Sequence, residues 1–530
     1  MRHSDQSRRL FLQQAARLAG ASALSLAFPG LALSKTRAWP FGLGVASGSP
    51  LPDRVMLWTR LVPETITGPL DVPLPVKLRW EVAEDEQFRK VVSSGEVTAL
   101  PQLGHSVHVD AAGLAPDRWY WYRFQTADAV SPVGRTRTAP AAQSMPGALR
   151  FAVASCQHWE FGHYAAHGHI ANAGVDLVAF LGDYIYEWGP YDLKHPELPR
   201  RTAASISLAE YRNRYAQYKS DPKLQAAHLA APWIVTWDDH EVANDYSGAH
   251  DERMGAAYLA RRAAAYQAFY EHMPVRLHQL PAPGKAFANL RIYERYDWGS
   301  LARFHMLDDR QYRALHACQP AEGGSSSVTN AACPERLQAG RSMLGAEQEA
   351  WLAQGMAQSP ARWNFLAQQT LMAQASQIPV HKPGDGRFWT DGWDGYPDAR
   401  DRLFADIARH RPANPVVLSG DVHTFYATEL RRDFNRPVSA ENPVLATEFC
   451  STSITSSSRP QSRTDQYVAQ NPHIRYGRSD RRGFILAELS PARLKASFIG
   501  LEDVQQPESR AEVLASFVVE NGKAGLVRAD

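Results

Sequence analysis

The chain has 530 residues, with 57 Lys and Arg against 55 Asp and Glu, which gives a formal net charge of +2. This length allows one large hydrophobic core plus a second domain. The near balance of charge, without a basic block or an acidic tail, argues against a nucleic-acid-binding protein and against extended acidic disorder, and no nucleic-acid-binding module is evident.

The first residues indicate an export signal. Ser7-Arg8-Arg9-Leu10-Phe11-Leu12 is a twin-arginine pattern, followed by an apolar stretch at 15–33 and small residues near 34. A short amphipathic helix is the alternative interpretation. We predict a twin-arginine signal peptide at 1–34, the twin-arginine export machinery as a partner, and a periplasmic or secreted protein. No other apolar run is long enough to span a bilayer, so we expect a soluble mature chain. We also expect this chain to be a monomer.

Residues 41–140 predict an all-β N-terminal domain. Val76–Val82 and His105–Val109 alternate as strands do, and the aromatic run Trp119–Phe124 follows a Leu-x-Pro corner. Short strands separated by turn signals are typical of a small immunoglobulin- or fibronectin-like sandwich. We interpret the aromatic run as core and corner packing, with a ligand platform as the alternative. The proline-punctuated segment 139–146 is the expected linker.

From residue 147 to about 520 the pattern alternates between strands and helices, which predicts an α/β (α+β) domain. The expected strands are Leu149–Ala154, Leu177–Leu181, Trp233–Trp237, Leu301–Leu307, Trp363–Ala367, Pro415–Ser419, Phe484–Leu489, Leu494–Ile499 and Val513–Val519. The expected helices lie between the first two strands and at Leu208–Ser220, Lys223–Leu229, Met254–His272, Ala346–Gln354 and Arg400–His410. Segment 379–399, rich in Gly, Asp and Trp, is expected to be a structured loop.

The four cysteines separate into a candidate pair and two single residues. Cys318 and Cys333 flank a Gly/Ser-rich loop, and they predict a disulfide in an oxidising compartment, with two free thiols as the alternative. Cys450 is interpreted as a core residue.

Four apolar strands end in side chains that can bind metal. The candidates are Cys156 after the first strand, Asp183 and Tyr186 after the second, Asp238, Asp239 and His240 after the third, and Asp421 and His423 after the fourth. Any one of them alone is better read as a turn former or a helix cap. A sheet brings successive strand ends to one edge, where crowded carboxylates repel one another unless cations neutralise them. Together the residues predict a site for several metal ions.

The donor types suggest two different ions. The Tyr186 phenol and the Cys156 thiol, with imidazole and carboxylate, fit ferric iron better than magnesium. Asp238, Asp239 and Asn244 are hard oxygen ligands that suit calcium or magnesium. Buried core packing is the alternative interpretation for Tyr186 and Cys156.

Two further residues suggest phosphate chemistry. Arg310 can present a planar guanidinium to phosphate, with a plain Asp308–Arg310 surface pair as the alternative. His240 can donate a proton or hydrogen-bond a ligand, and the sequence does not separate these roles. Paired cations clamp a tetrahedral oxyanion and lower the pKa of bound water, so the predicted reaction is hydrolysis of a phosphate ester.

At this point the ordered motifs resemble the PhoD-type alkaline phosphatase (metallophosphoesterase) family. They are Ser155-Cys156-Gln157, Gly182–Glu187, Trp237–Asp245, Leu307–Arg313, Trp393–Pro397, Gly420–His423 and Thr452–Ser456. The resemblance implies a metallophosphoesterase two-sheet sandwich flanked by helices, Fe³⁺ and Ca²⁺ as cofactors, and hydrolysis of a small-molecule phosphate ester outside the cytoplasm.

The resemblance also implies roles for individual residues. Iron would be held by Cys156, Asp183, Tyr186, Asp421 and His423, with Asp183 bridging to calcium. The calcium-side candidates are Asp238, Asp239 and Asn244, and Arg310 would hold the substrate phosphate. The family more often has Thr where this chain has Asp309, and that carboxylate either weakens phosphate binding or orients the guanidinium.

We therefore expect an exported alkaline phosphatase that hydrolyses phosphomonoesters. The sequence leaves open whether it also hydrolyses phosphodiesters. A phosphodiesterase of phospholipase D type is the alternative enzyme. A calcium-dependent binding or adhesion protein is the alternative outside the enzymes.

Overall fold

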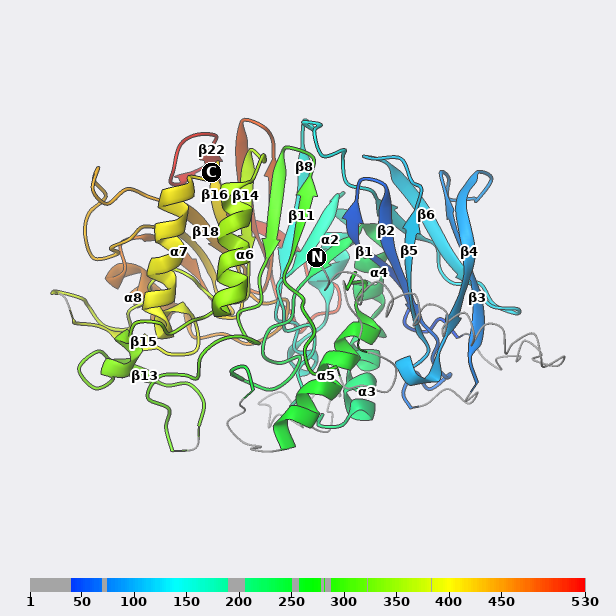
Figure 1. Cartoon of the computed structure of the whole chain (residues 1–530), viewed down its shortest axis with the longest axis horizontal. Coiled ribbons are helices and arrows are strands. Elements are labelled where there is room, and N and C mark those ends of the chain that lie inside the picture. The colour runs from blue at the N-terminus through cyan, green and yellow to red at the C-terminus, as the bar shows by residue number, and fades with distance from the viewer. Residues whose placement is uncertain are drawn as a thin grey trace, which may run out of the picture.

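The computed structural model describes residues 40–68, 74–188, 205–249, 257–277, 281, 287–321, 323–382 and 384–529. The expected signal peptide at 1–34 lies outside the described residues. Two large β-sheets form the centre of the molecule, and a smaller β region lies at one end (Figure 1). Among the described residues, no helix combines the length and apolar character needed to cross a membrane.

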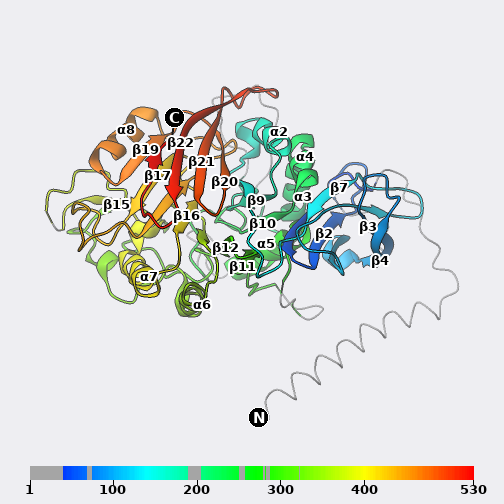
Figure 2. The same ribbon diagram turned by 90° about the horizontal axis from the view of Figure 1, so that it is seen from above.

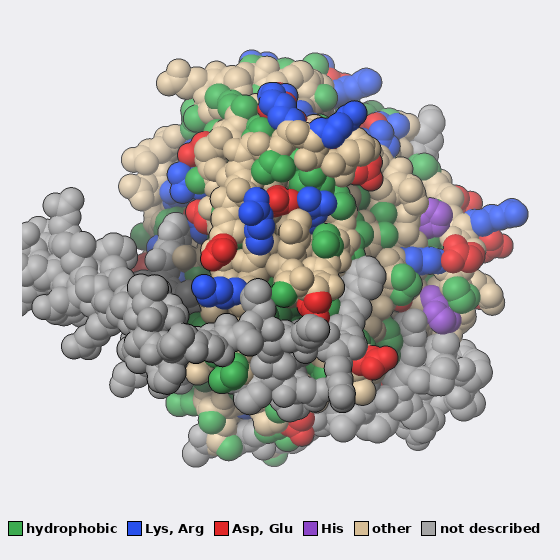
Figure 3. All heavy atoms as spheres, turned by 90° about the vertical axis from the view of Figure 1, so that its right-hand side faces the viewer, with side chains coloured by type: hydrophobic (Ala, Val, Ile, Leu, Met, Phe, Trp, Pro, Cys, Tyr) green, Lys and Arg blue, Asp and Glu red, His purple; other side chains and the backbone are tan. Residues whose placement is uncertain are grey.

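The described part of the N-terminal region, 40–68 and 74–140, contains seven strands that form two facing groups. One group is β1 (Val45–Leu51), β2 (Arg54–Arg60) and β5 (Ser106–Ala112), and the other is β3 (Val76–Ala83), β4 (Val91–Ala99), β6 (Trp119–Gln125) and β7 (Gly134–Arg137). Apolar side chains of both groups form one hydrophobic cluster between them. On the face of this end seen in Figure 3, basic and acidic side chains of described residues intermingle rather than gathering by sign.

The aromatic run in β6 packs as a core strand. Tyr120, Tyr122 and Phe124 alternate into the core and are at most 2% exposed. The Tyr120 hydroxyl accepts a hydrogen bond from the Ala115 amide at 2.8 Å, which anchors the corner before the strand. On the other face, the Arg135 guanidinium lies 3.5 Å from the centroid of a Trp119 ring. The core and corner interpretation holds for the buried face, and the outer face is covered by arginine.

The N-terminal region shares a sheet with the rest of the chain. Strand β1 pairs in parallel with β10 (Trp233–Val235), with Gly48 opposite Trp233. A Cβ atom on Gly48 would lie 2.6 Å from the Trp233 carbonyl oxygen and 2.5 Å from that of Pro274, so only glycine permits this approach. The segment predicted as a separate domain therefore adds β1, β2 and β5 to the main sheet.

That main sheet has ten strands, in the order β23-β22-β21-β20-β8-β9-β10-β1-β2-β5. Its remaining members are β8 (Leu149–Ala154), β9 (Leu177–Phe180), β20 (Gly483–Leu489), β21 (Arg493–Leu501), β22 (Ala511–Glu520) and β23 (Val527–Arg528). The neighbours β8, β9 and β10 run parallel. Their loops therefore emerge side by side at the carboxyl ends.

A second sheet has seven strands, in the order β11-β12-β14-β16-β18-β17-β19. They are β11 (Glu294–Trp298), β12 (Ala302–Met306), β14 (Trp363–Ala367), β16 (Pro415–Ser419), β17 (Phe425–Leu430), β18 (Ala446–Cys450) and β19 (Ile474–Arg478). Side chains of both large sheets form one hydrophobic cluster, in which Phe151 contacts Phe304 and Phe365 edge-on, with centroids 5.3 and 5.4 Å away. The two sheets thus form the two central layers.

Helices cover the outer faces of both sheets (Figure 2). Helices α2 (Ala165–Asn172), α3 (Leu208–Lys219), α4 (Pro222–Ala230) and α5 (Tyr258–His272) form a cluster with the ten-stranded sheet. Helices α6 (Gly345–Ala357) and α7 (Pro397–His410) cover the seven-stranded sheet, and α8 (Gln461–Gln470) lies beside β19.

The predicted strands and helices of the main domain are present, with shifted ends, although the first three residues of the helix predicted at Met254–His272 lie outside the described residues. The predicted strand at Trp233–Trp237 ends at Val235, and the predicted helix at Arg400 begins at Pro397, a favourable first helical position. The expected loop at 379–399 contains β15 (Arg387–Trp389), paired with β13 (Ser327–Thr329), and the short 3-10 helix η5 (Trp393–Gly395).

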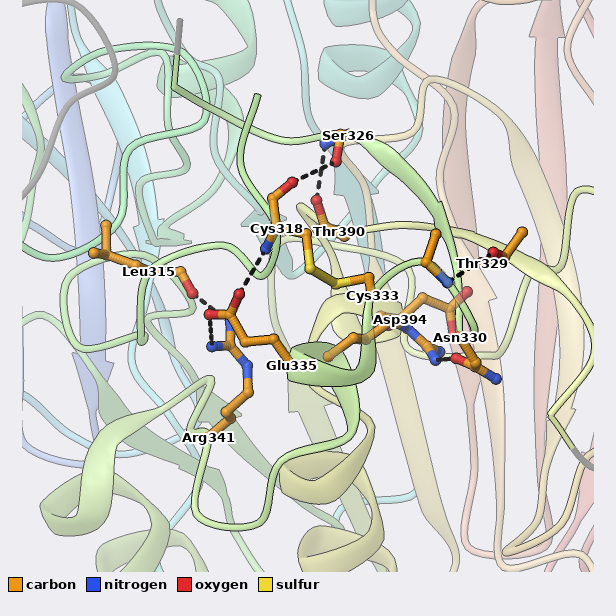
Figure 4. Close-up of a disulfide and its surroundings, with 12 residues drawn as sticks. Leu315, Cys318, Ser326, Thr329, Asn330, Cys333, Glu335, Arg341, Thr390 and Asp394 are labelled. Carbon is orange, nitrogen blue, oxygen red and sulfur yellow. Dashed lines mark hydrogen bonds and ion pairs between the residues drawn. A yellow bond between two sulfur atoms is a disulfide. The ribbon is translucent and has the colours of Figure 1, made fainter. Parts of the chain in front are cut away.

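The predicted disulfide between Cys318 and Cys333 is present (Figure 4). The Glu335 carboxylate accepts the Cys318 amide at 2.9 Å and pairs with Arg341 at 3.3 Å, which fixes the same loop non-covalently. Among the described residues, Cys156 and Cys450 are the free cysteines, and both are buried.

Replacing both Cys318 and Cys333 by serine is expected to lower the free energy of unfolding by about 3 kcal/mol, because the bond closes a loop with a sequence separation of 15 residues. Denaturant unfolding with and without dithiothreitol measures this. The unmodified chain should lose stability when reduced, whereas the double variant should not change. Equal stability of the two oxidised proteins would contradict the prediction.

Candidate metal centre

The predicted metal-binding residues meet between the two large sheets. Cys156, Asp183 and Asp238 follow β8, β9 and β10 of the ten-stranded sheet, whereas Asp421 and His423 follow β16 of the seven-stranded sheet. The expectation that a single sheet edge collects all four strand ends was therefore wrong. Face-to-face packing of two sheets brings the fourth loop to the other three.

Four candidate ligands have a strained backbone conformation. The φ angles are 61° at Cys156, 56° at Asp183, 59° at Asp421 and 54° at His423. Residues other than glycine rarely adopt this left-handed region, and such residues concentrate at functional sites. The loops are therefore held in a conformation that aims these side chains, at a local conformational cost.

The candidate ligand atoms form three overlapping groups. They are Cys156, Asp183 and His423; Asp183, Asp239 and His240; and Asp238, Asp239 and Asp421, and within each group the atoms lie within 4.8 Å of one another. Asp183 belongs to the first two groups and Asp239 to the last two, so the groups form one continuous cluster. Asn244 follows on the same loop as Asp239, and its backbone N–H donates to Glu187 at 2.8 Å.

Tyr186 faces this cluster with its hydroxyl group. The hydroxyl donates to Asp183 Oδ2 at 2.6 Å, lies 3.2 Å from His423 Nε2 and accepts from Ser456 Oγ at 2.7 Å. Simple core packing is therefore excluded for Tyr186, although its side chain is buried. His423 Nδ1 lies 2.6 Å from the Ser457 carbonyl oxygen, which directs Nε2 to the cluster.

His240 is held by an acidic partner outside the cluster. Its Nδ1 lies 2.8 Å from Glu187 Oε2, and its backbone N–H donates to Asp239 Oδ1 at 3.0 Å. Burial opposes protonation of the ring, but the carboxylates of Asp239, Asp183 and Glu187 outweigh it and raise the pKa of His240 well above its usual value. The protonated form is thus favoured when no cation is bound.

Glu241 is a positioning residue that the sequence analysis missed. Its carboxylate accepts the backbone N–H groups of Asp183 at 3.1 Å, Tyr184 at 2.6 Å and Asp238 at 2.8 Å. It therefore ties together the loops after β9 and β10. Burial raises the pKa of Glu241 to about 8. Its place directly after His240 was visible in the sequence, but its role depends on β9 and β10 being neighbours.

Arg310 lies within the acidic cluster and is fully buried. Its Nε donates to Asp238, its Nη1 to both oxygens of Asp391 at 2.8 Å, and its Nη2 to Asp421 Oδ1 at 3.3 Å. Asp308 is also buried and accepts the Arg310 backbone N–H at 3.1 Å, so the surface-pair alternative is wrong. With Asp239 Oδ1 3.8 Å from Nη2, the guanidinium lies within ion-pair distance of four carboxylates, those of Asp238, Asp239, Asp391 and Asp421.

Asp391 is the second residue that the sequence analysis missed. Besides Arg310, it accepts from Arg313 at 2.8 Å and lies 2.9 Å from His316 Nε2. Burial alone would raise its pKa, but these cationic partners hold the pKa of Asp391 well below its usual range. It lies in the Gly-, Asp- and Trp-rich loop, and only its tertiary neighbours distinguish it from other acidic loop residues.

The residues fit a site for more than one cation. Asp238 Oδ2 is buried and has no hydrogen-bond partner among the described residues. Burial and neighbouring carboxylates raise the pKa values of Asp238 and Asp421 well above the usual range, despite the opposing charge of Arg310. Burial and the charge of Asp183 raise those of Cys156 and Tyr186. Cations reverse these effects, so the donors suit a softer ion near Cys156 and a harder one near Asp238.

Asp309 has an unusual environment beside Arg310. It is completely buried, and neither carboxylate oxygen has a hydrogen-bond partner among the described residues. Burial raises the pKa of Asp309 to about 7. Its backbone N–H donates to Gln369 at 3.2 Å, but its carboxylate makes no hydrogen bond to the Arg310 guanidinium within the described structure. The geometry gives no support for an orienting role.

A cavity of about 560 Å³ leads to one side of the cluster, and Asp421 and His423 belong to its wall. The side chains of these two residues are 22% and 24% exposed, whereas Asp183 and Asp238 are buried. A substrate would therefore approach the cluster from the Asp421 and His423 side.

Comparisons with known proteins agree over nearly the whole chain. A sequence profile described as PhoD-like phosphatase matches residues 151–498, and one described as PhoD-like phosphatase, N-terminal domain, matches residues 28–140. Alkaline phosphatase D of Bacillus subtilis (strain 168) is 42% identical over 537 residues, covering 98% of this chain and 88% of that protein. A solved structure of PhoD has a TM-score of 0.86 at 41% identity, covering 94% of this chain and 93% of that one.

Proposed function

Because this chain belongs to the PhoD-like phosphatase family and is a phosphoester hydrolase, we propose that it hydrolyses phosphomonoesters, with diesters as a second activity, at an iron and calcium centre outside the cytoplasm. The single observation that carries the metal assignment is the continuous cluster of donor groups that shares Asp183 and Asp239. The twin-arginine pattern at Arg8 and Arg9 supports export to the periplasm or beyond the cell. We also propose that the exported protein is a monomer.

The fold assignment extends this proposal. Two large sheets with a common core support a metallophosphoesterase-type sandwich over 147–520. The strand orders β1-β2-β5 and β4-β3-β6-β7, which face each other across one hydrophobic cluster, support a fibronectin-like N-terminal domain over 41–140.

Ferric iron would be held by the first donor group, Cys156, Asp183 and His423, with Tyr186, which contacts two of its members. Asp421, which belongs to the third donor group and lies two residues before His423, would complete the iron ligands. Thiolate, phenolate, imidazole and carboxylate together favour a strongly Lewis-acidic, borderline ion over magnesium. Calcium would be held on the oxygen-rich side by Asp238, Asp239 and Asn244, with Asp183 shared between the two sides. When bound, the ions would neutralise phosphoryl oxygens and make water acidic enough to react at neutral pH.

Side chains of the protein bind the phosphoryl group and protonate the leaving group. Arg310 balances the charge of the acidic cluster and holds a phosphoryl oxygen through Nη2. This nitrogen is the best placed to change partner, because its bond to Asp421, at 3.3 Å, is the longest of the hydrogen bonds that the guanidinium makes to carboxylates. His240 donates a proton to the leaving group through Nε2, because Nδ1 is occupied by Glu187. Glu241 and Glu187 fix the loops that carry these groups.

The substrate class is tested by comparing p-nitrophenyl phosphate with its bis ester on the natively exported protein. We expect turnover of the monoester, and calcium chelation should abolish it reversibly without unfolding the main domain. Circular dichroism before and after chelation controls for unfolding. Exclusive cleavage of the bis ester would instead favour the phosphodiesterase of phospholipase D type, and full activity in excess chelator would contradict the calcium assignment.

The iron assignment is tested with the two buried free cysteines. The purified protein is expected to be coloured, because phenolate and thiolate on ferric iron absorb visible light. Cys156→Ser should lower the visible absorbance and the iron content per chain. Cys450→Ser is the matched control, because Cys450 is equally buried but belongs to none of the three donor groups. Its Sγ contacts the Gly420 carbonyl oxygen at 3.4 Å instead. A colourless, fully active enzyme would contradict the assignment.

A further inference from the structure

The cavity beside the candidate metal centre carries positive charge that the proposed reaction does not use. Arg459 and Arg463 line it together with Asp421 and His423. Arg459 precedes α8 and Arg463 lies in its first turn, and their guanidinium carbons lie 4.9 and 5.1 Å from the centroid of the Tyr467 ring. One aromatic ring therefore gathers two guanidinium groups at one side of the cavity.

Neither guanidinium is neutralised by an acidic partner. Among the described residues, no carboxylate lies within ion-pair distance of Arg459 or Arg463, and Arg463 donates instead to the Gln466 side-chain oxygen at 3.0 Å. Both side chains are half-buried, where charge is screened less than on an open surface. The pair therefore offers an anion several free hydrogen-bond donors.

Three of the four acidic residues that line the same cavity, Asp391, Asp394 and Asp421, pair with an arginine. Asp391 accepts from Arg310 and Arg313, Asp394 pairs with Arg400 at 2.8 Å, and Asp245 accepts from a serine hydroxyl. Asp421 belongs to the candidate metal centre. Apart from Asp245, whose carboxylate is held by a hydroxyl group and not by a cation, the unpaired charge that the cavity wall presents away from the metal centre is thus the positive charge of Arg459 and Arg463.

An apolar surface also lines the cavity. The Trp389 side chain of β15 is 47% exposed there, in contrast to the buried core tryptophans such as Trp363 and Trp393. An exposed indole ring in a cavity can cover the carbon skeleton of a bound molecule.

We propose that Arg459 and Arg463 form a second anion-binding site, which holds a distal phosphate or carboxylate of a substrate whose scissile phosphate lies at Asp421 and His423. This inference rests on the proposed function, and it deepens that function by naming the substrate class: phosphoesters with an organic arm that bears a second anionic group. The arm crosses the cavity along Trp389.

The test compares n-hexyl phosphate with diol bisphosphates of three to eight carbons, with release of inorganic phosphate as the readout. We expect kcat/KM for the best bisphosphate to exceed that for n-hexyl phosphate by about 10- to 100-fold, because hydrogen bonds to charged groups contribute free energies of that size. The difference should arise mainly from a lower KM, and it should become smaller when salt is added. Arg459→Gln with Arg463→Gln should remove this advantage and leave n-hexyl phosphate turnover within about twofold.

A matched control removes two arginines that do not line the cavity. Arg89→Gln with Arg409→Gln, whose side chains are 79% and 67% exposed, should keep the bisphosphate advantage. Thermal unfolding checks each variant, and the single variant Arg463→Gln replaces the double variant if that one fails to fold. Equal kcat/KM for the two substrates in the unmodified enzyme, or an equal loss for both in the variant, would overturn the second site. Absence of turnover with any monoester would instead overturn the proposed function.

Discussion

Asp183→Asn is expected to lower kcat/KM for p-nitrophenyl phosphate by roughly 10³-fold or more, the loss that corresponds to about 4 kcal/mol of transition-state stabilisation. Asp183 contributes to two of the three donor groups, and its carboxylate also contacts Tyr186 and the His240 backbone N–H at 2.6 and 3.4 Å. Asparagine keeps the size but removes the charge and one acceptor, so neither ion would keep its shared ligand.

The measurement combines kinetics with the content of iron and calcium per chain. Asp221→Asn is the matched control, because Asp221 caps α4 through the N–H groups of Lys223 and Leu224 at 2.9 and 3.2 Å. Asparagine also serves as an N-cap, so the control should retain activity, metal content and nearly all its stability. If Asp183→Asn kept its metals and its activity within tenfold, the shared-ligand role would be wrong.

The candidate ligands were predictable because each follows an apolar strand. Leu177–Leu181 is an apolar run that stops at Gly182 and Asp183, and Pro415–Ser419 stops in the same way before Asp421. Parallel strands place such residues at one end of a sheet, which is a local rule that one sequence suffices to apply. That rule correctly assembled the loops of β8, β9 and β10.

Three features depend on contacts between distant segments of the chain: the role of Asp391, the two-sheet origin of the site and the acidic partners of Arg310. Asp391 meets Arg310 across 81 residues of sequence and His316 across 75. No periodicity encodes such pairings, and the short strands β17 to β19 were missed for the same reason: their burial comes from neighbours rather than from a distinctive local pattern. The extension of the main sheet by β1 also rests on a single non-local register at Gly48.

Asp309→Asn is expected to stabilise the protein above pH 7. Burial raises the pKa of Asp309 to about 7 from an ordinary value of 3.8. The folded state therefore holds the proton to a higher pH than the unfolded state does. Between about pH 4 and pH 7 the unfolded state loses its proton first, so this residue lowers the free energy of unfolding as the pH rises. The full cost is up to about 4 kcal/mol, reached once the folded carboxyl also ionises.

Denaturant unfolding of the unmodified chain and of Asp309→Asn at pH 5, 7 and 8.5 measures this effect. The two proteins should differ least at pH 5, and the variant should be the more stable at pH 8.5. Asp309→Thr also removes the ionisable carboxyl, and it should show the same change in pH dependence. Asp406→Asn, which removes one partner of a surface ion pair, is the control and should shift stability by less than about 1 kcal/mol at every pH. Parallel pH profiles for the unmodified chain and Asp309→Asn would show that the buried carboxyl finds a compensating cation or hydrogen bond, and would contradict its raised pKa.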